Sequence, residues 1–86
     1  MSDTLAVLGG GSWGTALAIA LARRGHRVRL WTLQDRDAQA MNALRMNAQF
    51  LPDIVLPPGL TATADLTAAV SGAQGVLVVV PSGAFR

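Results

Sequence analysis

Residues 4–14 read Thr-Leu-Ala-Val-Leu-Gly-Gly-Gly-Ser-Trp-Gly, and this stretch decides the fold. Its first part, Thr4–Leu8, is a short apolar run that is typical of a buried strand. Three glycines with the spacing G-x-G-x-x-G follow, namely Gly9, Gly11 and Gly14. An uninterrupted segment rich in alanine and leucine, residues 13–24, then predicts a helix. The glycine turn therefore connects a strand to a helix.

The rest of the chain repeats this alternation. Further strands are predicted at residues 28–32, 60–63 and 75–80, and further helices at residues 36–46 and 65–70. We expect Gly25 to end the first helix, Asp35 to cap the second, and Asp65 or Thr63 to cap the third. Residues 47–59 contain three prolines and predict an irregular connection.

Strands that alternate with helices predict a parallel sheet with right-handed crossovers. We therefore expect an α/β fold with a Rossmann-type parallel sheet and flanking helices, of which the chain holds the first four strands in the order 3-2-1-4. In such a sheet the ligand crevice lies beyond the carboxyl ends of strands 1 and 4. The residues expected opposite the glycine turn are Pro81, Ser82 and Ala84. Ser82 either contacts a ligand there or only turns the chain.

In this context the glycine motif predicts a dinucleotide site. Gly9 permits a tight turn out of the strand, Gly11 lets a pyrophosphate approach the backbone, and Gly14 lets the helix pack closely. Free N–H groups and the dipole at the helix start hold the phosphate charge. Trp13, on the first helical turn, either covers the pyrophosphate or packs on the sheet. The simpler alternative is a glycine turn without a ligand.

The end of the second strand bears on the choice of cofactor. A fold that prefers NAD usually has an acid about 20 residues after the last glycine, and that position is Gln34. Asp35 comes one residue later and is either that acid or a helix cap. Arg36 either accepts a 2′-phosphate or is a solvated arginine. These residues favour NADP weakly and leave NAD open.

Composition narrows the remaining classes of protein. The 86 residues allow one small domain, and a 51% hydrophobic content fits either a membrane protein or a core-rich part of something larger. No apolar run reaches the roughly 20 residues of a membrane span, and the first residues lack a basic leader, so we expect a cytoplasmic protein. Without cysteine and with one histidine, disulfides and a Cys/His metal site are excluded.

An arginine cluster follows the first predicted helix and continues into the second strand: Arg23, Arg24, Arg27 and Arg29. A basic cluster is compatible with nucleic-acid binding, but no aromatic residues interleave it. A solvated face is the more frequent explanation, so we expect no nucleic-acid partner.

Four stretches resemble the NAD(P)-dependent glycerol-3-phosphate dehydrogenases of the bacterial type. They are residues 9–18, residues 25–31, residues 47–57 and residues 79–82. The third contains Asn-Ala-Gln-Phe-Leu-Pro-Asp-Ile at 47–54, a segment that few other Rossmann proteins have. It is therefore more specific than the glycine motif.

The resemblance implies an oxidoreductase that interconverts sn-glycerol 3-phosphate and dihydroxyacetone phosphate by hydride transfer with NAD(P), supplying phospholipid synthesis in the cytoplasm. Ser12 and Trp13 match the cofactor-binding pair of the family. Leu33 falls where the family often has arginine, histidine or phenylalanine near the adenosine. Leucine there can pack on adenine but cannot hold a 2′-phosphate, which weakens the argument for NADP. Ala84 falls in the turn that approaches the nicotinamide side.

The family uses lysines for substrate binding and acid–base catalysis, and this chain has none. The resemblance implies that they lie beyond Arg86, together with the helical substrate domain. We therefore expect an N-terminal fragment that binds the cofactor weakly and has no turnover alone. Its oligomeric state, with a homodimer as one option, depends on that second domain. The alternatives are the nucleotide-binding half of another NAD(P)-dependent reductase, such as a ketopantoate reductase relative, and a non-catalytic NAD(H)-sensing module.

Overall fold

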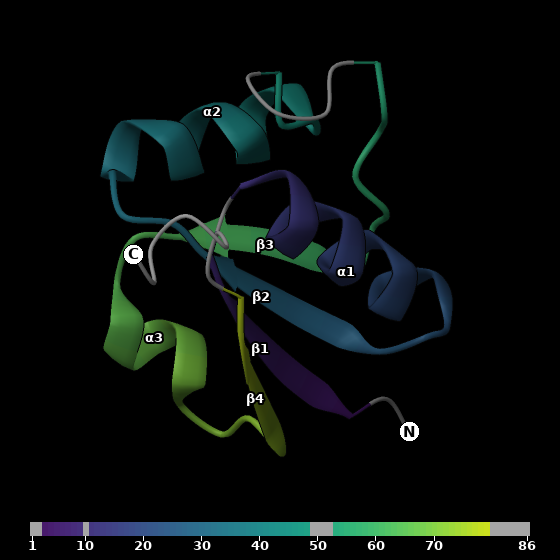
Figure 1. Cartoon of the computed structure of the whole chain (residues 1–86), viewed down its shortest axis with the longest axis vertical. Helices are drawn as coiled ribbons and strands as arrows, with labels where there is room; N and C mark the ends of the chain where they lie inside the picture. Colours follow the sequence, from purple (N-terminus) through teal and green to yellow (C-terminus); the bar gives the residue numbers. More distant parts are fainter. Residues whose placement is uncertain (1–2, 10, 49–52, 80–86) are drawn as a thin grey trace, which may run out of the picture.

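The computed structural model describes residues 3–9, 11–48 and 53–79. Strands and helices alternate along the chain (Figure 1): β1 (Thr4–Leu8), α1 (Ser12–Arg23), β2 (Arg27–Trp31), α2 (Asp35–Leu44), β3 (Leu60–Thr63), α3 (Leu66–Val70) and β4 (Gly75–Val78). The strands form one parallel sheet in the order β3-β2-β1-β4. The predicted α/β fold and strand order are confirmed.

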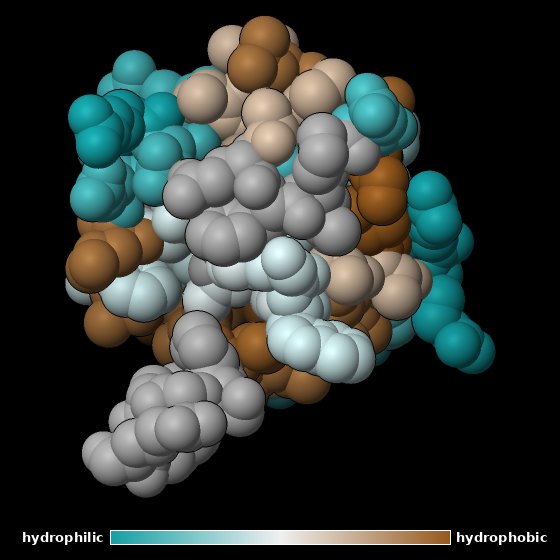
Figure 2. All heavy atoms as spheres, turned by 45° about the horizontal axis from the view of Figure 1, so that its top comes forward, coloured by the Kyte–Doolittle hydropathy of each residue, from teal (hydrophilic) through white to brown (hydrophobic). Residues whose placement is uncertain are grey.

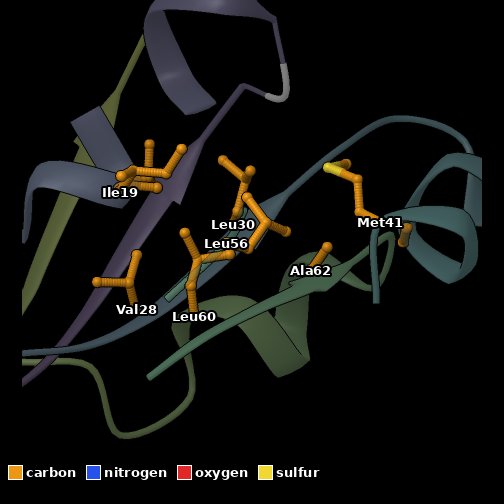
Figure 3. Packing of buried hydrophobic residues seen from close by; sticks show 10 residues of the cluster. Ile19, Val28, Leu30, Met41, Leu56, Leu60 and Ala62 are labelled. Carbon is orange, nitrogen blue, oxygen red and sulfur yellow. The ribbon is translucent and has the colours of Figure 1, made fainter. Parts of the chain in front are cut away.

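Helices pack on both faces of this sheet. On one face, α1 and α2 cover a cluster of buried apolar side chains, which Figure 3 shows at close range: Val7, Ala18, Ile19, Val28, Leu30, Ala38, Met41, Leu56, Leu60 and Ala62. On β2, Val28 and Leu30 point into this cluster, and Arg29 lies between them in sequence. Successive side chains of a strand point to opposite faces. Arg29 accordingly reaches the other face, where its Nη1 donates to the carbonyl oxygens of Ala68 and Ser71 at α3.

The second helix begins differently from the prediction. Asp35 was expected to be its cap, but Asp35 is the first helical residue and the N-cap is Gln34, without a side-chain hydrogen bond. The Asp35 carboxylate instead accepts from Nε2 of Gln39, one turn further along, so the predicted cap is wrong. The helix ends at Leu44, two residues earlier than predicted, because Arg45 has a left-handed backbone with φ of 55°.

The other helix ends agree more closely with the sequence. Asp65 caps α3 by accepting a 3.2 Å hydrogen bond from the backbone N–H of Ala68. Gly25 comes one residue after the C-cap of α1, which is Arg24, and has φ of +98°. A glycine in this position relieves the strain that a side chain would cause.

The last strand, β4, is an edge of the sheet. Its hydrogen-bonded pairing with β1 continues one residue past Val78, because the N–H of Val79 donates to the carbonyl of Leu8 at 2.9 Å. Val80, the predicted last residue of this strand, lies outside the described residues. As expected for an uncovered apolar edge, Val76 is 48% exposed and Val78 is 67% exposed. Across residues 3–9, 11–48 and 53–79, no helix is both long and apolar enough to cross a membrane.

Candidate functional site

Two glycines of the G-x-G-x-x-G motif are required by the packing of the protein itself. Gly9 has φ of +135°, and a Cβ built on it would lie 2.3 Å from the carbonyl oxygen of Val79. A Cβ on Gly14 would lie 1.6 Å from the carbonyl oxygen of Gly9. The end of β1 therefore touches the chain after β4 on one side and the first turn of α1 on the other, backbone against backbone. A side chain at either position would separate them.

Gly11, the middle glycine, is different. Its φ of −77° and ψ of −168° are extended values that any residue adopts. A Cβ built on it would meet no described atom within 4 Å. Neither backbone strain nor packing among the described residues thus requires a glycine here. Within the described part of the chain, nothing occupies the space in front of Gly11.

The start of α1 faces this space with its N–H groups. Gly11 is the N-cap and provides no side-chain hydrogen bond, and the first turn holds no acidic residue. The first backbone hydrogen bond of the helix runs from the N–H of Thr15 to the carbonyl of Gly11, at 2.9 Å. The positive end of the helix dipole lies at this start, where it attracts an anion. A 12-residue helix with this start suits the pyrophosphate of a dinucleotide.

Large apolar side chains stand exposed around the glycine turn. Trp13 is 81% exposed and Leu33 is 78% exposed. Of the two alternatives for Trp13, packing on the sheet is therefore wrong. Leu33 lies two residues after Trp31, which pairs with Leu8 at the end of β1. The turns after β1 and β2 are therefore neighbours at the same edge of the sheet.

Arg36 lies on the first turn of α2, next to this edge. Its Nε donates a 2.9 Å hydrogen bond to Oε1 of Gln34. Gln34 is the position where a fold that prefers NAD usually has an acid. The arginine is thus oriented by a neutral amide instead of a carboxylate.

The structure brings together most of the predicted site residues at the carboxyl ends of β1 and β2: Gly9, Gly11, Ser12, Trp13, Gly14, Leu33 and Arg36. The other three, Pro81, Ser82 and Ala84, lie outside the described residues and stay predictions. Figure 2 shows hydrophilic surface gathered at the upper left and the right of the molecule, and apolar surface at the top and in the lower part. Among the described residues, no group of three or more His, Cys, Asp or Glu side chains can hold a metal ion.

The arginine cluster lies away from this edge. A cavity of about 660 Å³ is located at the amino ends of the strands, and its lining includes Thr4, His26, Arg27 and Thr61. None of the predicted cofactor-binding residues lines it. Of the cluster, Arg27 and Arg29 line this cavity, at the opposite end of the strands from the glycine turn.

One contact near the glycine turn escaped the sequence analysis. Nδ2 of Asn47 donates a 2.8 Å hydrogen bond to Oγ1 of Thr15, and both residues are buried. The available signal was a threonine on the buried side of a helix otherwise packed through alanine, glycine and isoleucine. Asn47 belongs to the segment that carries the family resemblance, but nothing local in the sequence pairs it with Thr15.

Comparisons with known proteins agree with this geometry. A sequence model of the family described as NAD-dependent glycerol-3-phosphate dehydrogenase N-terminus matches residues 4–86. A glycerol-3-phosphate dehydrogenase (NAD(P)+) of Halorhodospira halophila is 57% identical over 86 residues, which is 100% of this chain and 26% of that protein. Its counterpart in Thioalkalivibrio sulfidiphilus is 59% identical over 85 residues, covering 95% of this chain and 25% of that protein.

A solved structure leads to the same family. The crystal structure of glycerol-3-phosphate dehydrogenase from Coxiella burnetii superposes with a TM-score of 0.87 at 44% identity, over 94% of this chain and 25% of that one. The chain thus spans about a quarter of the length of the curated relatives it matches. Because the family model covers nearly all of the chain, the chain belongs to the family of the NAD-dependent glycerol-3-phosphate dehydrogenase N-terminus.

Proposed function

We propose that residues 1–86 form the first part of a dinucleotide-binding domain and hold NAD or NADP for a glycerol-3-phosphate dehydrogenase. The observation that carries this proposal is the contrast among the three motif glycines. Packing requires Gly9 and Gly14, whereas no described atom explains Gly11. A pyrophosphate that passes close to the protein backbone at Gly11 explains why no side chain stands there.

Each residue of the site then has a physical role. The N–H groups at the start of α1 bind the pyrophosphate oxygens, and Gly11 lets them approach. Trp13 and Ser12 stand exposed on the first helical turn and border the bound cofactor. Leu33 provides an apolar surface for the adenine, and Arg36 lies where a ribose phosphate would be recognised. When bound, the nicotinamide supplies the acceptor or donor of a hydride.

The reaction proposed for the whole enzyme is the interconversion of sn-glycerol 3-phosphate and dihydroxyacetone phosphate, which supplies phospholipid synthesis. The support is that two relatives, at 57% and 59% identity, are glycerol-3-phosphate dehydrogenases. We assign no proton transfer to this chain, because it has no lysine to act in acid–base catalysis. A cytoplasmic location, a homodimeric assembly and the absence of a nucleic-acid partner stay predictions.

The choice between NAD and NADP rests on the turn after β2. Leu33 cannot bind a phosphate, whereas the Arg36 guanidinium can, and it does so between Asp35 and Asp37 on the first turn of α2. We propose that the site accepts both cofactors.

A titration tests the proposal. NADH and NADPH are added to the chain, and excitation of tryptophan is used to detect nicotinamide emission; ADP and adenosine then serve as competitors. We expect saturable binding of both cofactors and stronger competition by ADP, because only ADP carries the diphosphate that α1 attracts. Absence of saturable binding, or equal competition by adenosine, would contradict the proposal.

A further inference from the structure

The buried hydrogen bond between Asn47 and Thr15 joins two segments that are 32 residues apart in sequence. Thr15 is 0% exposed and Asn47 is 5% exposed. Burying an amide and a hydroxyl is unfavourable unless each finds a partner. The two side chains therefore hold one another in place.

Thr15 is well placed to influence the glycine turn. It follows Gly14 directly, and its N–H closes the first turn of α1 onto the carbonyl of Gly11. The turn that presents N–H groups to the pyrophosphate is thus bounded by Gly11 and Thr15. A shift of Thr15 changes the direction of these groups.

Asn47 is itself fixed by the segment to which it belongs. Two residues before it, the Arg45 carbonyl accepts a 2.7 Å hydrogen bond from the N–H of Leu56, and Arg45 Nη2 donates to the Pro57 carbonyl at 2.6 Å. Leu56 is 2% exposed and packs in the core beside Leu30 and Leu60 (Figure 3). The connection between α2 and β3 is therefore anchored near both of its ends. From this anchored segment, Asn47 reaches α1.

We infer that Asn47 is a positioning residue for cofactor binding: through Thr15 it holds the first turn of α1 in the orientation that receives the diphosphate. This inference rests on the proposed function. The inference gives the connection between α2 and β3 a role in binding, although none of the predicted cofactor-binding residues lies in this connection. A purely structural role would instead lower stability without a specific effect on binding.

The test compares two asparagine variants. Asn47→Ala removes the bond to Thr15, and Asn42→Ala is the matched control. Nδ2 and Oδ1 of Asn42 bond the carbonyl and N–H of Ala62, on β3 and away from the glycine turn. We expect both variants to lose stability in urea unfolding. Only Asn47→Ala is expected to raise the Kd for NADH, by about tenfold, which corresponds to about 1.4 kcal/mol.

Thr15 variants test the same bond from its other end. Thr15→Val keeps the shape but removes the acceptor, and Thr15→Ser keeps the acceptor. We expect Thr15→Val to reproduce the loss of affinity and Thr15→Ser to restore binding. An unchanged Kd in Thr15→Val, or an equal rise in Asn42→Ala, would overturn the inference. If Asn47→Ala does not fold, the two Thr15 variants still test whether the bond between Asn47 and Thr15 affects the Kd for NADH.

Amide hydrogen exchange separates this inference from the proposed function. If Asn47 positions the turn, Asn47→Ala and Thr15→Val accelerate exchange of the backbone amide of residue 15, which donates to the Gly11 carbonyl, at least several-fold more than Asn42→Ala does, without any cofactor present. Failure of the wild-type chain to bind NADH, with this exchange pattern intact, contradicts the proposed function and leaves the positioning of the turn supported. Unchanged exchange of the backbone amide of residue 15 overturns the positioning.

Discussion

Gly14 lies so close to Gly9 that a Cβ on Gly14 would lie 1.6 Å from the Gly9 carbonyl oxygen. Because the obstacle is backbone, relief requires α1 to move away from the end of β1. We predict that Gly14→Ala lowers the free energy of unfolding by about 3 kcal/mol or more, at the upper end of overpacking costs. Urea unfolding followed by circular dichroism measures this loss.

The control for Gly14→Ala is Gly25→Ala. Gly25 has φ of +98° but open space around its Cβ position, so strain is the only cost, about 1–2 kcal/mol. A smaller loss in Gly14→Ala than in Gly25→Ala would show that the close approach does not limit the fold.

The two tryptophans contribute differently to stability. Trp13 is 81% exposed, so Trp13→Phe is expected to change the free energy of unfolding by less than about 0.5 kcal/mol. Trp31 donates from Nε1 to the Ala64 carbonyl at 3.0 Å, so Trp31→Phe is expected to cost about 1 kcal/mol. Urea unfolding of both variants measures these changes. An equal loss of stability in the two variants would contradict this difference.

Arg36 is predicted to discriminate between the cofactors. Removal of its guanidinium by Arg36→Ala is expected to weaken NADPH binding by about tenfold, the effect of one charged hydrogen bond, and to leave NADH binding unchanged. Arg27→Ala is the matched control, because Arg27 lines the cavity at the amino ends of the strands, whereas Arg36 lies near their carboxyl ends. Equal losses for NADH and NADPH in Arg36→Ala would refute a role in 2′-phosphate recognition.

Asn42 protects an edge of the sheet. Its amide satisfies both the N–H and the carbonyl of Ala62 at 2.8 Å each, in the manner of a neighbouring strand. Asn42→Ala is expected to cost about 1–2 kcal/mol and to promote association through the exposed β3 edge. Light scattering and urea unfolding measure both effects, with the exposed Gln39→Ala as control. If Asn42→Ala changed neither the free energy of unfolding nor the light scattering, Asn42 would not be the group that protects the β3 edge.

The sequence contains enough local pattern to predict the sheet. The strands at Thr4–Leu8 and Leu60–Thr63 are short and separated by helices, and parallel connections allow few strand orders. The start of α2 was predicted less well because Gln34 and Asp35 both precede an amphipathic segment, and the backbone at Gln34 decides which of them is the cap. For the candidate site, the glycine spacing indicated the turn after β1.

Contacts between distant segments were beyond prediction. The Asn47–Thr15 and Asn42–Ala62 bonds join residues 32 and 20 positions apart. Each depends on where α2 and the following connection settle on the sheet. Asparagine at these positions has no periodicity or motif that indicates a partner.

Gly11→Ala provides the most direct test of the dinucleotide site. Because Gly11 has an ordinary φ and no described atom within 4 Å of its Cβ position, we predict that the variant loses no more than about 1 kcal/mol of its free energy of unfolding, the difference between glycine and alanine at an N-cap. The Kd for NADH is predicted to rise at least about tenfold, since the new methyl group occupies the path of the pyrophosphate. Stable Gly11→Ala protein that binds NADH as tightly as the wild type would contradict the account.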